Sequence, residues 1–128
     1  MTRAVLDTSV LVGSVSPGDL SGAISVASLA ELHFGLLVAS ADDERARRAA
    51  RVGIIEATFE PLPVDSLVAR EWGRLAAAIV SRGGQPRRRA MDLVIAATAN
   101  VHHLPLITAD TKDFAIIDDL VDIRGPHR

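Results

Sequence analysis

Four acidic residues stand at points where apolar segments of the chain end and helices begin. They are Asp7, Glu31, Asp92 and Asp110, and a fifth acid, Asp113, follows closely. Carboxylates that converge in one pocket repel one another, which raises the cost of ionising all of them unless a divalent cation supplies the opposite charge. These residues therefore indicate a metal site built from oxygen ligands.

Two of the acids follow short apolar runs that are typical of buried strands. Asp7 comes directly after Ala4-Val5-Leu6, and Asp110 ends the apolar run at 104–109. Open α/β sheets place their chemistry at the carboxyl ends of strands. If both strands belong to one parallel sheet, the two carboxylates meet at the same edge.

Asp92 and Glu31 lie near the predicted starts of two helices. Asp92 is the only charge in an apolar helix predicted over 90–101, and a lone carboxylate in such surroundings must be paired, capped or bound to a cation. Glu31 lies in the first turn of a helix predicted over 29–40. With Ser28 it also forms a Ser-x-x-Glu capping box, so we expect both a capping and a site role.

The elements that must position these acids alternate between short strands and helices. Strands are predicted at 3–6, 24–26, 58–62, 104–108 and 121–123. Helices are predicted at 8–15, 29–40, 43–56, 66–82 and 90–101, the fourth capped by Asp65 or Ser66. This alternation favours an α/β fold with a mostly parallel sheet covered on both faces.

Composition limits the class of protein. The 128 residues, of which 48% are hydrophobic and 23% charged, fit a single domain spanning 1–128, without repeats or a linker. The absence of Cys removes disulfides, thiolate zinc sites and cysteine nucleophiles, and is compatible with a reducing cytoplasm. No run approaches the roughly 18 apolar residues that a membrane span requires, so we expect a cytoplasmic protein.

Four motifs in order along about the whole chain resemble a PIN domain, and more narrowly the VapC-type ribonuclease toxins of VapBC toxin-antitoxin pairs. The motifs are Leu6-Asp7-Thr8-Ser9, Ser28-Leu29-Ala30-Glu31-Leu32 with Gly35, Asp92-Leu93-Val94-Ile95-Ala96-Ala97, and Thr108-Ala109-Asp110-Thr111-Lys112-Asp113-Phe114. The resemblance implies a three-layer α/β/α sandwich with a parallel sheet of four or five strands. It also implies a Mg²⁺- or Mn²⁺-dependent endoribonuclease, a homodimer, and a VapB-type antitoxin whose tail crosses the active site.

Motif positions assign roles to the acids. Asp7, Glu31, Asp92 and Asp110 match the family's metal-binding cluster, and Asp113 matches an accessory catalytic acid. The interval from Asp7 to Glu31 is short for the family, which indicates a trimmed first helix and loop. Ala109-Asp110 stands where many relatives carry Arg-Asn, so the division of duty between Asp110 and Asp113 stays open. The hydroxyls of Thr8, Ser9 and Thr108 could orient waters or carboxylates.

Structural roles compete with these assignments. Asp7 could simply cap the first helix, and Asp110 or Asp113 could form Asx turns. His33 is interpreted as a satisfied or partly exposed imidazole, and Trp72 as a core or interface residue. Leu36, Leu37 and Trp72 are candidates for a surface that binds a second copy or an antitoxin.

Arginine supplies 13 of the 14 basic residues and gathers in two clusters, although the net charge is −2. One cluster comprises Arg45, Arg47, Arg48 and Arg51, and the other Arg82, Arg87, Arg88 and Arg89. Because Arg87, Arg88 and Arg89 precede the helix that carries Asp92, we expect them to contact RNA phosphates.

Two other classes of protein compete with the nuclease. A haloacid-dehalogenase-like phosphatase also places Asp after its first strand, but Asp7-Thr8-Ser9 lacks the second acid two positions later. A catalytically silent module that keeps the fold and binds a protein or RNA is the stronger alternative, and metal titration would separate it from the enzyme. Dinucleotide and Walker glycine motifs are absent from the sequence.

Overall fold

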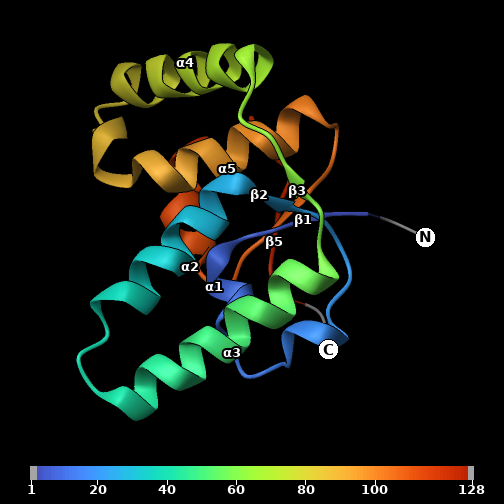
Figure 1. The fold of residues 1–128 in the computed structure, drawn as a ribbon. Helices are drawn as coiled ribbons and strands as arrows, with labels where there is room; N and C mark the ends of the chain where they lie inside the picture. Colours follow the sequence, from blue (N-terminus) through green and yellow to red (C-terminus); the bar gives the residue numbers. More distant parts are fainter. Residues whose placement is uncertain (1–2, 127–128) are drawn as a thin grey trace.

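Five short parallel strands lie at the centre of the computed structural model, which describes residues 3–126 (Figure 1). They are β1 (Val5–Leu6), β2 (Ile24–Ser25), β3 (Pro61–Leu62), β4 (Leu106–Ile107) and β5 (Ile123–Arg124). β4 pairs with β1 and β5, β2 pairs with β3, and a parallel bridge between Val5 and Ala23 joins the two groups. The order across the described sheet is therefore β3-β2-β1-β4-β5.

Helices cover both sides of these strands. They are α1 (Thr8–Leu11), α2 (Val26–Val38), α3 (Asp42–Thr58), α4 (Ser66–Ser81) and α5 (Ala90–Val101), with 3-10 helices η1 (Pro17–Asp19), η2 (Pro86–Arg89) and η3 (Thr111–Ile117). In Figure 1, α4 and α5 lie on one side of the strands and α3 lies on the other, while α2 and α3 form a hairpin that extends outwards. The strands are thus the middle layer of three.

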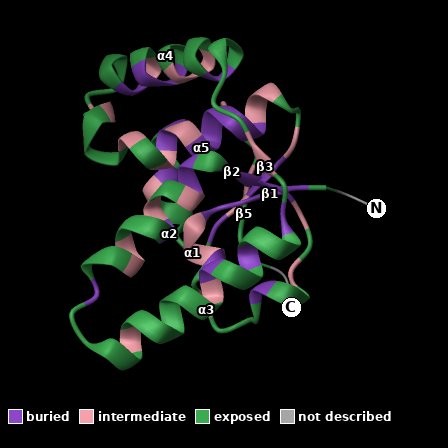
Figure 2. Ribbon diagram, viewed as in Figure 1, coloured by how far each residue is buried: buried purple, intermediate pink, exposed green. Residues whose placement is uncertain are grey.

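Side chains alternate between the two faces of a strand, and β1 shows the result. Val5 belongs to a core formed with α4, α5 and η3, whereas Leu6 belongs to a second core formed with α1, α2 and α3. Hydrophobic burial on both faces of a parallel sheet confirms the predicted α/β/α sandwich. Figure 2 shows the buried residues concentrated in the strands and α5, while most of α3 is exposed.

The helix α5 occupies the middle of the larger core. Five of its hydrophobic residues are fully or nearly fully buried, because the helix is apolar around most of its circumference and packs between α4 and the sheet. These residues are Leu93, Ile95, Ala96, Ala97 and Ala99. The neighbouring α4 begins at the predicted cap, where the Asp65 carboxylate accepts a hydrogen bond from Val68 N at 3.0 Å. The start of α5, which carries Asp92, is therefore held firmly against the sheet.

Several predicted boundaries differ from the structure. The strand predicted at 24–26 ends at Ser25, and its helix begins at Val26 because Ser25 Oγ accepts a hydrogen bond from Ala27 N. The helix predicted at 8–15 is a single turn that ends at Leu11, and the last strand lies two residues later than predicted, at Ile123–Arg124. The 3-10 helix η3, which follows β4, was not predicted from the sequence. In residues 3–126, no helix has the length and apolar character needed to cross a membrane.

Candidate active site

The five candidate acids line one open pocket of about 510 Å³ at the carboxyl edge of the sheet. Asp7 follows β1 and Asp110 follows β4, and these two strands are hydrogen-bonded neighbours. Glu31 comes from α2, Asp92 from the first turn of α5, and Asp113 from η3. The other lining residues are Thr8, Ser9, Val12, Arg89 and Ala109. The parallel topology thus brings together acids that are up to about a hundred positions apart.

Asp7 is the most deeply buried of these acids, with 4% of its surface exposed. Its Oδ2 atom accepts hydrogen bonds from Ser9 Oγ at 2.6 Å and from Thr108 Oγ1 at 2.9 Å. Its Oδ1 atom is buried and has no hydrogen-bond partner among the described residues. Asp7 occupies the N-cap position of α1, but its side chain accepts no capping bond, so the capping interpretation is wrong. A buried carboxylate oxygen without a partner is costly, and a cation would relieve that cost.

Glu31 is held by a hydroxyl from the other side of the pocket. Thr8 Oγ1 donates to Glu31 Oε1 at 2.7 Å and lies 3.0 Å from Ser28 Oγ. Because Ser25 caps α2, the predicted Ser28-Glu31 capping box does not exist, and Glu31 lies in the second turn of the helix. Its position is therefore explained by the pocket and not by helix capping.

Asp92 is an acid whose pKa the pocket raises. The pKa of its carboxyl is raised from the ordinary 3.8 to about 6, first by burial and then by the negative charges of Asp7 and Glu31. The Arg89 guanidinium, whose Nη1 lies 3.4 Å from Asp92 Oδ2, opposes this rise in pKa. A carboxylate that is costly to ionise in a cleft is a candidate functional group.

Asp110 and Asp113 differ in their surroundings. The exposed Asp110 carboxylate makes no hydrogen bond within residues 3–126, and its backbone N–H donates to Thr108 Oγ1 at 3.0 Å. Asp113 Oδ2 lies 2.9 Å from Arg89 Nη1. Neither side chain accepts a backbone hydrogen bond in the described chain, so the Asx-turn interpretation is not supported for either residue.

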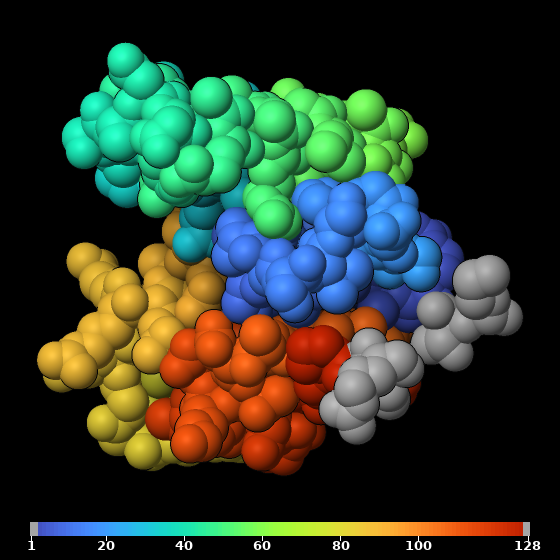
Figure 3. Space-filling view, turned by 90° about the horizontal axis from the view of Figure 1, so that it is seen from below, coloured from blue at the N-terminus to red at the C-terminus, as the bar shows by residue number. Residues whose placement is uncertain are grey.

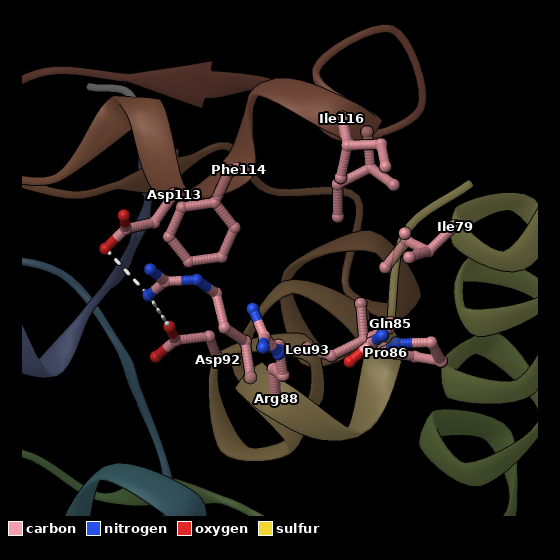
Figure 4. A pocket seen from close by; sticks show the side chains of 12 residues that line it. Ile79, Gln85, Pro86, Arg88, Asp92, Leu93, Asp113, Phe114 and Ile116 are labelled. Carbon is pink, nitrogen blue, oxygen red and sulfur yellow. Dashed lines mark hydrogen bonds and ion pairs between the residues drawn. The ribbon is translucent and has the colours of Figure 1, made fainter. Parts of the chain in front are cut away.

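Arg89 was expected to contact RNA phosphates together with its two neighbours, but the structure places it in the acidic pocket. Its Nη1 atom bridges Asp92 and Asp113, as the dashed lines in Figure 4 show. The spacing of three residues between Arg89 and Asp92 was a signal for this pair, because such residues share one face of a helical turn. Arg87 and Arg88 are exposed and form no ion pair in the described part of the chain.

The five acids line one pocket, but their side chains are not arranged as a metal-coordination site. Among residues 3–126, no group of three or more Asp, Glu or His side chains is arranged so that it could hold a metal ion. The Arg89 guanidinium, which lies between Asp92 and Asp113, supplies part of the positive charge that the pocket requires. A divalent cation would need the carboxylates to draw together and would compete with this guanidinium.

A second and larger hollow of about 820 Å³ adjoins the acidic pocket, with which it shares Thr8, Val12 and Glu31. It lies between α2 and α3 and is lined by Arg47, Arg48 and Arg51. Figure 3 shows a notch between α3 and the gold segment that contains η2, of which Arg89 lines the acidic pocket. A ligand that follows the notch can therefore reach the acids.

The remaining candidates have structural partners. His33 Nε2 lies 3.1 Å from Glu56 Oε2, with both side chains half exposed, which confirms that His33 is a satisfied surface residue. Trp72 donates its Nε1–H to Ala90 O at 3.2 Å and packs, partly buried, against the larger core. Leu37, by contrast, is 74% exposed.

Comparisons of the sequence and the structure with known proteins agree with the fold described above. The family model described as "PIN domain" matches residues 4–120. Ribonuclease VapC5 of Mycobacterium tuberculosis is 40% identical over 126 residues, which cover 93% of this chain and 90% of that protein. Ribonuclease VapC4 of the same species is 34% identical, with 92% and 93% covered. A crystal structure described as a member of the VapBC family, VapBC-5 from Mycobacterium tuberculosis, superposes with a TM-score of 0.83 at 37% identity and covers 100% of both chains.

Proposed function

This chain belongs to the PIN domain family, and from that premise we propose that it is an endoribonuclease, the toxin of a type II toxin-antitoxin pair. The proposed reaction is hydrolysis of RNA phosphodiester bonds in the acidic pocket. The observation that carries the proposal is the buried Asp7 carboxylate. Its Oδ1 atom has no hydrogen-bond partner within residues 3–126, while four further acids line the same pocket. We treat residues 1–128 as one nuclease domain of a cytoplasmic protein.

The donor set of the pocket fits Mg²⁺ or Mn²⁺. Both ions prefer carboxylate oxygens and retain several waters, so a pocket with carboxylates and open space suits them. Asp7, Glu31, Asp92 and Asp110 would hold the ion, with Asp113 as an accessory acid. When bound, such an ion supplies a water nucleophile and stabilises the negative charge that develops on the phosphate.

The residues around the acids have orienting roles. Ser9 and Thr108 donate to the same oxygen of Asp7 and leave its other oxygen available, so they fix the direction in which Asp7 binds. Thr8 does the same for Glu31. The Arg89 guanidinium pairs with Asp92 and Asp113, so it would have to give way for these two carboxylates to hold a cation. Its guanidinium is then able to contact a substrate phosphate.

The proposed partners are RNA, a VapB-type antitoxin and a second copy of the chain. The notch beside α3 opens onto the acidic pocket, which supports an antitoxin tail that crosses the site. Phe34, Leu37 and Val38 expose large apolar side chains at the outer end of α2, which supports a protein partner there. Light scattering should give a homodimer, and a monomer at every concentration would reject self-association.

Purified protein incubated with total RNA tests the proposed activity. We expect cleavage with Mg²⁺ or Mn²⁺ and none after addition of a chelator. Calorimetric titration with Mn²⁺, on wild-type protein and on Asp92→Asn, measures metal binding without reference to activity. The silent binding module is the alternative, and the Arg89 bridge across Asp92 and Asp113 favours it. Metal binding without cleavage of any RNA, or no metal binding at all, would select that alternative.

A further inference from the structure

A small apolar pocket of about 190 Å³ lies directly beside the acidic pocket and is not used by the proposed hydrolysis (Figure 4). The two pockets share Arg89, Asp92 and Asp113. The walls of the small pocket come from the end of α4, from η2, from the start of α5 and from η3. A group bound in it would therefore lie next to whatever the acids hold.

Apolar side chains form most of its lining. Phe114 and Leu93 are buried at its inner side, whereas Ile116 is 36% exposed and lies at its outer side. Gly84 is required for this geometry, since a Cβ at that position would lie 2.7 Å from Ile79 Cγ2 and 2.7 Å from Ile116 Cδ1. A larger residue would push these walls apart.

Polar groups stand at the edge of the pocket. The side-chain amide of Gln85, which carries both donors and an acceptor, makes no hydrogen bond within residues 3–126. The exposed Arg88 also lines the pocket and forms no ion pair within the same range. An apolar slot with an amide and a guanidinium at its rim matches a flat heterocycle attached to a phosphate.

We propose that this pocket binds one unstacked base of the RNA, on a nucleotide that flanks the scissile phosphate. The inference rests on the proposed ribonuclease function, and it assigns the base specificity of that same site. Proteins read single-stranded RNA by splaying out bases and by hydrogen-bonding their edges. The cavity lies below the roughly 300–1,000 Å³ of pockets for drug-sized ligands, so it suits a single ring system.

Each lining group then has a distinct task. Leu93, Phe114 and Ile116 remove the base from water, and the Gln85 amide bonds to its edge and selects among bases. Arg88 contacts the phosphate of the bound nucleotide. The chain has no Tyr and only three Phe, so enclosure by aliphatic side chains and the single ring of Phe114 replaces a platform of several aromatic rings.

Sequencing of the cut sites in a random RNA pool tests the assignment. Wild-type protein should prefer one base at one fixed position beside the cut. Ile116→Trp fills the pocket and Gln85→Ala removes the amide, so each should lower that preference by about fivefold, the effect of one lost hydrogen bond or contact of about 1 kcal/mol. Val80→Trp is the control, because Val80 is 61% exposed on α4 and does not line the pocket.

Binding of mononucleotides provides a readout that does not depend on cleavage. In a chelator, the methyl NMR signals of Ile79, Ile116 and Ile117 should shift with one of AMP, CMP, GMP and UMP more than with the others. Gln85→Ala should reduce the difference among the four nucleotides.

The two experiments separate the inference from the function on which it rests. Cleavage without base preference, or a preference that both variants retain, would overturn the base pocket and leave the ribonuclease intact. Absence of cleavage would reject the ribonuclease, and the methyl titration would then decide the pocket. Equal shifts with all four nucleotides, or none, would overturn it.

Discussion

Charged residues crowd two neighbouring regions of the molecule, the surface of α3 and the acidic pocket. On α3 the carboxylate of Glu44 binds Arg47 at 2.5 Å and Arg48 at 2.7 Å. The hydrogen bond from Arg48 lowers the pKa of Glu44 most, and that from Arg47 lowers it further. In the pocket, Asp7 Oδ1 has no partner in the described residues and the pKa of Asp92 is raised to about 6. One region compensates its charges, and the other leaves negative charge uncompensated.

The two regions therefore use their charged residues differently. Exposed ion pairs such as those of α3 contribute little to stability, and their charges leave little capacity for a ligand. Arg51 donates to Leu11 O at 2.7 Å, and Arg48 also donates to Gly35 O at 2.6 Å, so these arginines hold neighbouring elements together. Uncompensated carboxylates in a cleft, by contrast, support the proposed binding of a cation.

The largest expected effect comes from neutralising an acid of the pocket. Asp7→Asn or Asp92→Asn should reduce RNA cleavage by more than the ~10–100-fold that residues which only orient metal ligands typically contribute. The melting temperature in chelator should stay unchanged or rise, because one repelling charge is removed. Paired melting and cleavage assays measure both effects.

Glu44→Gln is the matched control on α3, since it removes a carboxylate that already has partners. We expect normal cleavage and only a small loss of stability. Wild-type cleavage in both pocket variants would contradict the metal-hydrolase proposal, and unfolding of both would make the acids structural.

The next effect compares the two groups of arginines. Replacing Arg87 and Arg88 by Ala should weaken RNA binding and make the dependence of log affinity on log salt shallower by about 1.4, at ~0.7 for each lost phosphate contact. The Arg47→Ala/Arg48→Ala variant should leave the salt slope unchanged, because these arginines bind Glu44. Fluorescence anisotropy at several salt concentrations gives both slopes. A change confined to the α3 variant would move the RNA-binding surface to the notch.

A smaller effect, on metal binding, is expected when Arg89 is replaced. Arg89→Gln removes the only described cation that bridges Asp92 and Asp113, so Mn²⁺ should bind severalfold more tightly. Isothermal titration calorimetry at constant pH measures this change, with Arg88→Gln as the control. Weaker Mn²⁺ binding in Arg89→Gln would mean that the guanidinium holds the pocket in shape.

The smallest effect is a pH dependence of stability. The pKa of Asp92 is near 3.8 in the unfolded chain and about 6 in the folded protein, so the folded state holds more protons between these values. Its contribution to the free energy of unfolding therefore falls as the pH rises from about 4 to about 6, and then stays constant. Urea unfolding in chelator should show this fall in wild-type protein, and Asp92→Asn should lack it. Identical pH profiles would place the titration elsewhere.

Much of the fold could be predicted from local patterns. The apolar run before Asp7, the cap at Asp65 and the apolar helix that begins near residue 90 each correspond to a structural element. Errors arose where tertiary contacts decide the boundary. Ser25, which belongs to the end of a strand, also caps α2, and this second role shifts the helix start by three residues. A capping box at Ser28 fitted the sequence equally well, because the pattern does not show which Ser the sheet uses.

The candidate acids could be identified from the sequence, but their surroundings could not. Asp7 and Asp110 stood at strand ends, and parallel pairing of the strands then placed them in one pocket. The bridge formed by Arg89 depends on where η3 brings Asp113, and no local pattern predicted that helix. The apolar base pocket likewise depends on the close approach of Gly84 to Ile116, more than thirty positions away.

The hydroxyl of Thr108 has a consequence for how the protein is made. It donates to Asp7 across 101 positions, and Asp7 N also donates to Ile107 O at 2.8 Å. A nascent chain on the ribosome therefore has no acidic pocket until nearly all of it has emerged, since β1 must wait for β4 as its partner. Premature termination before residue 108 would release fragments that lack the pocket.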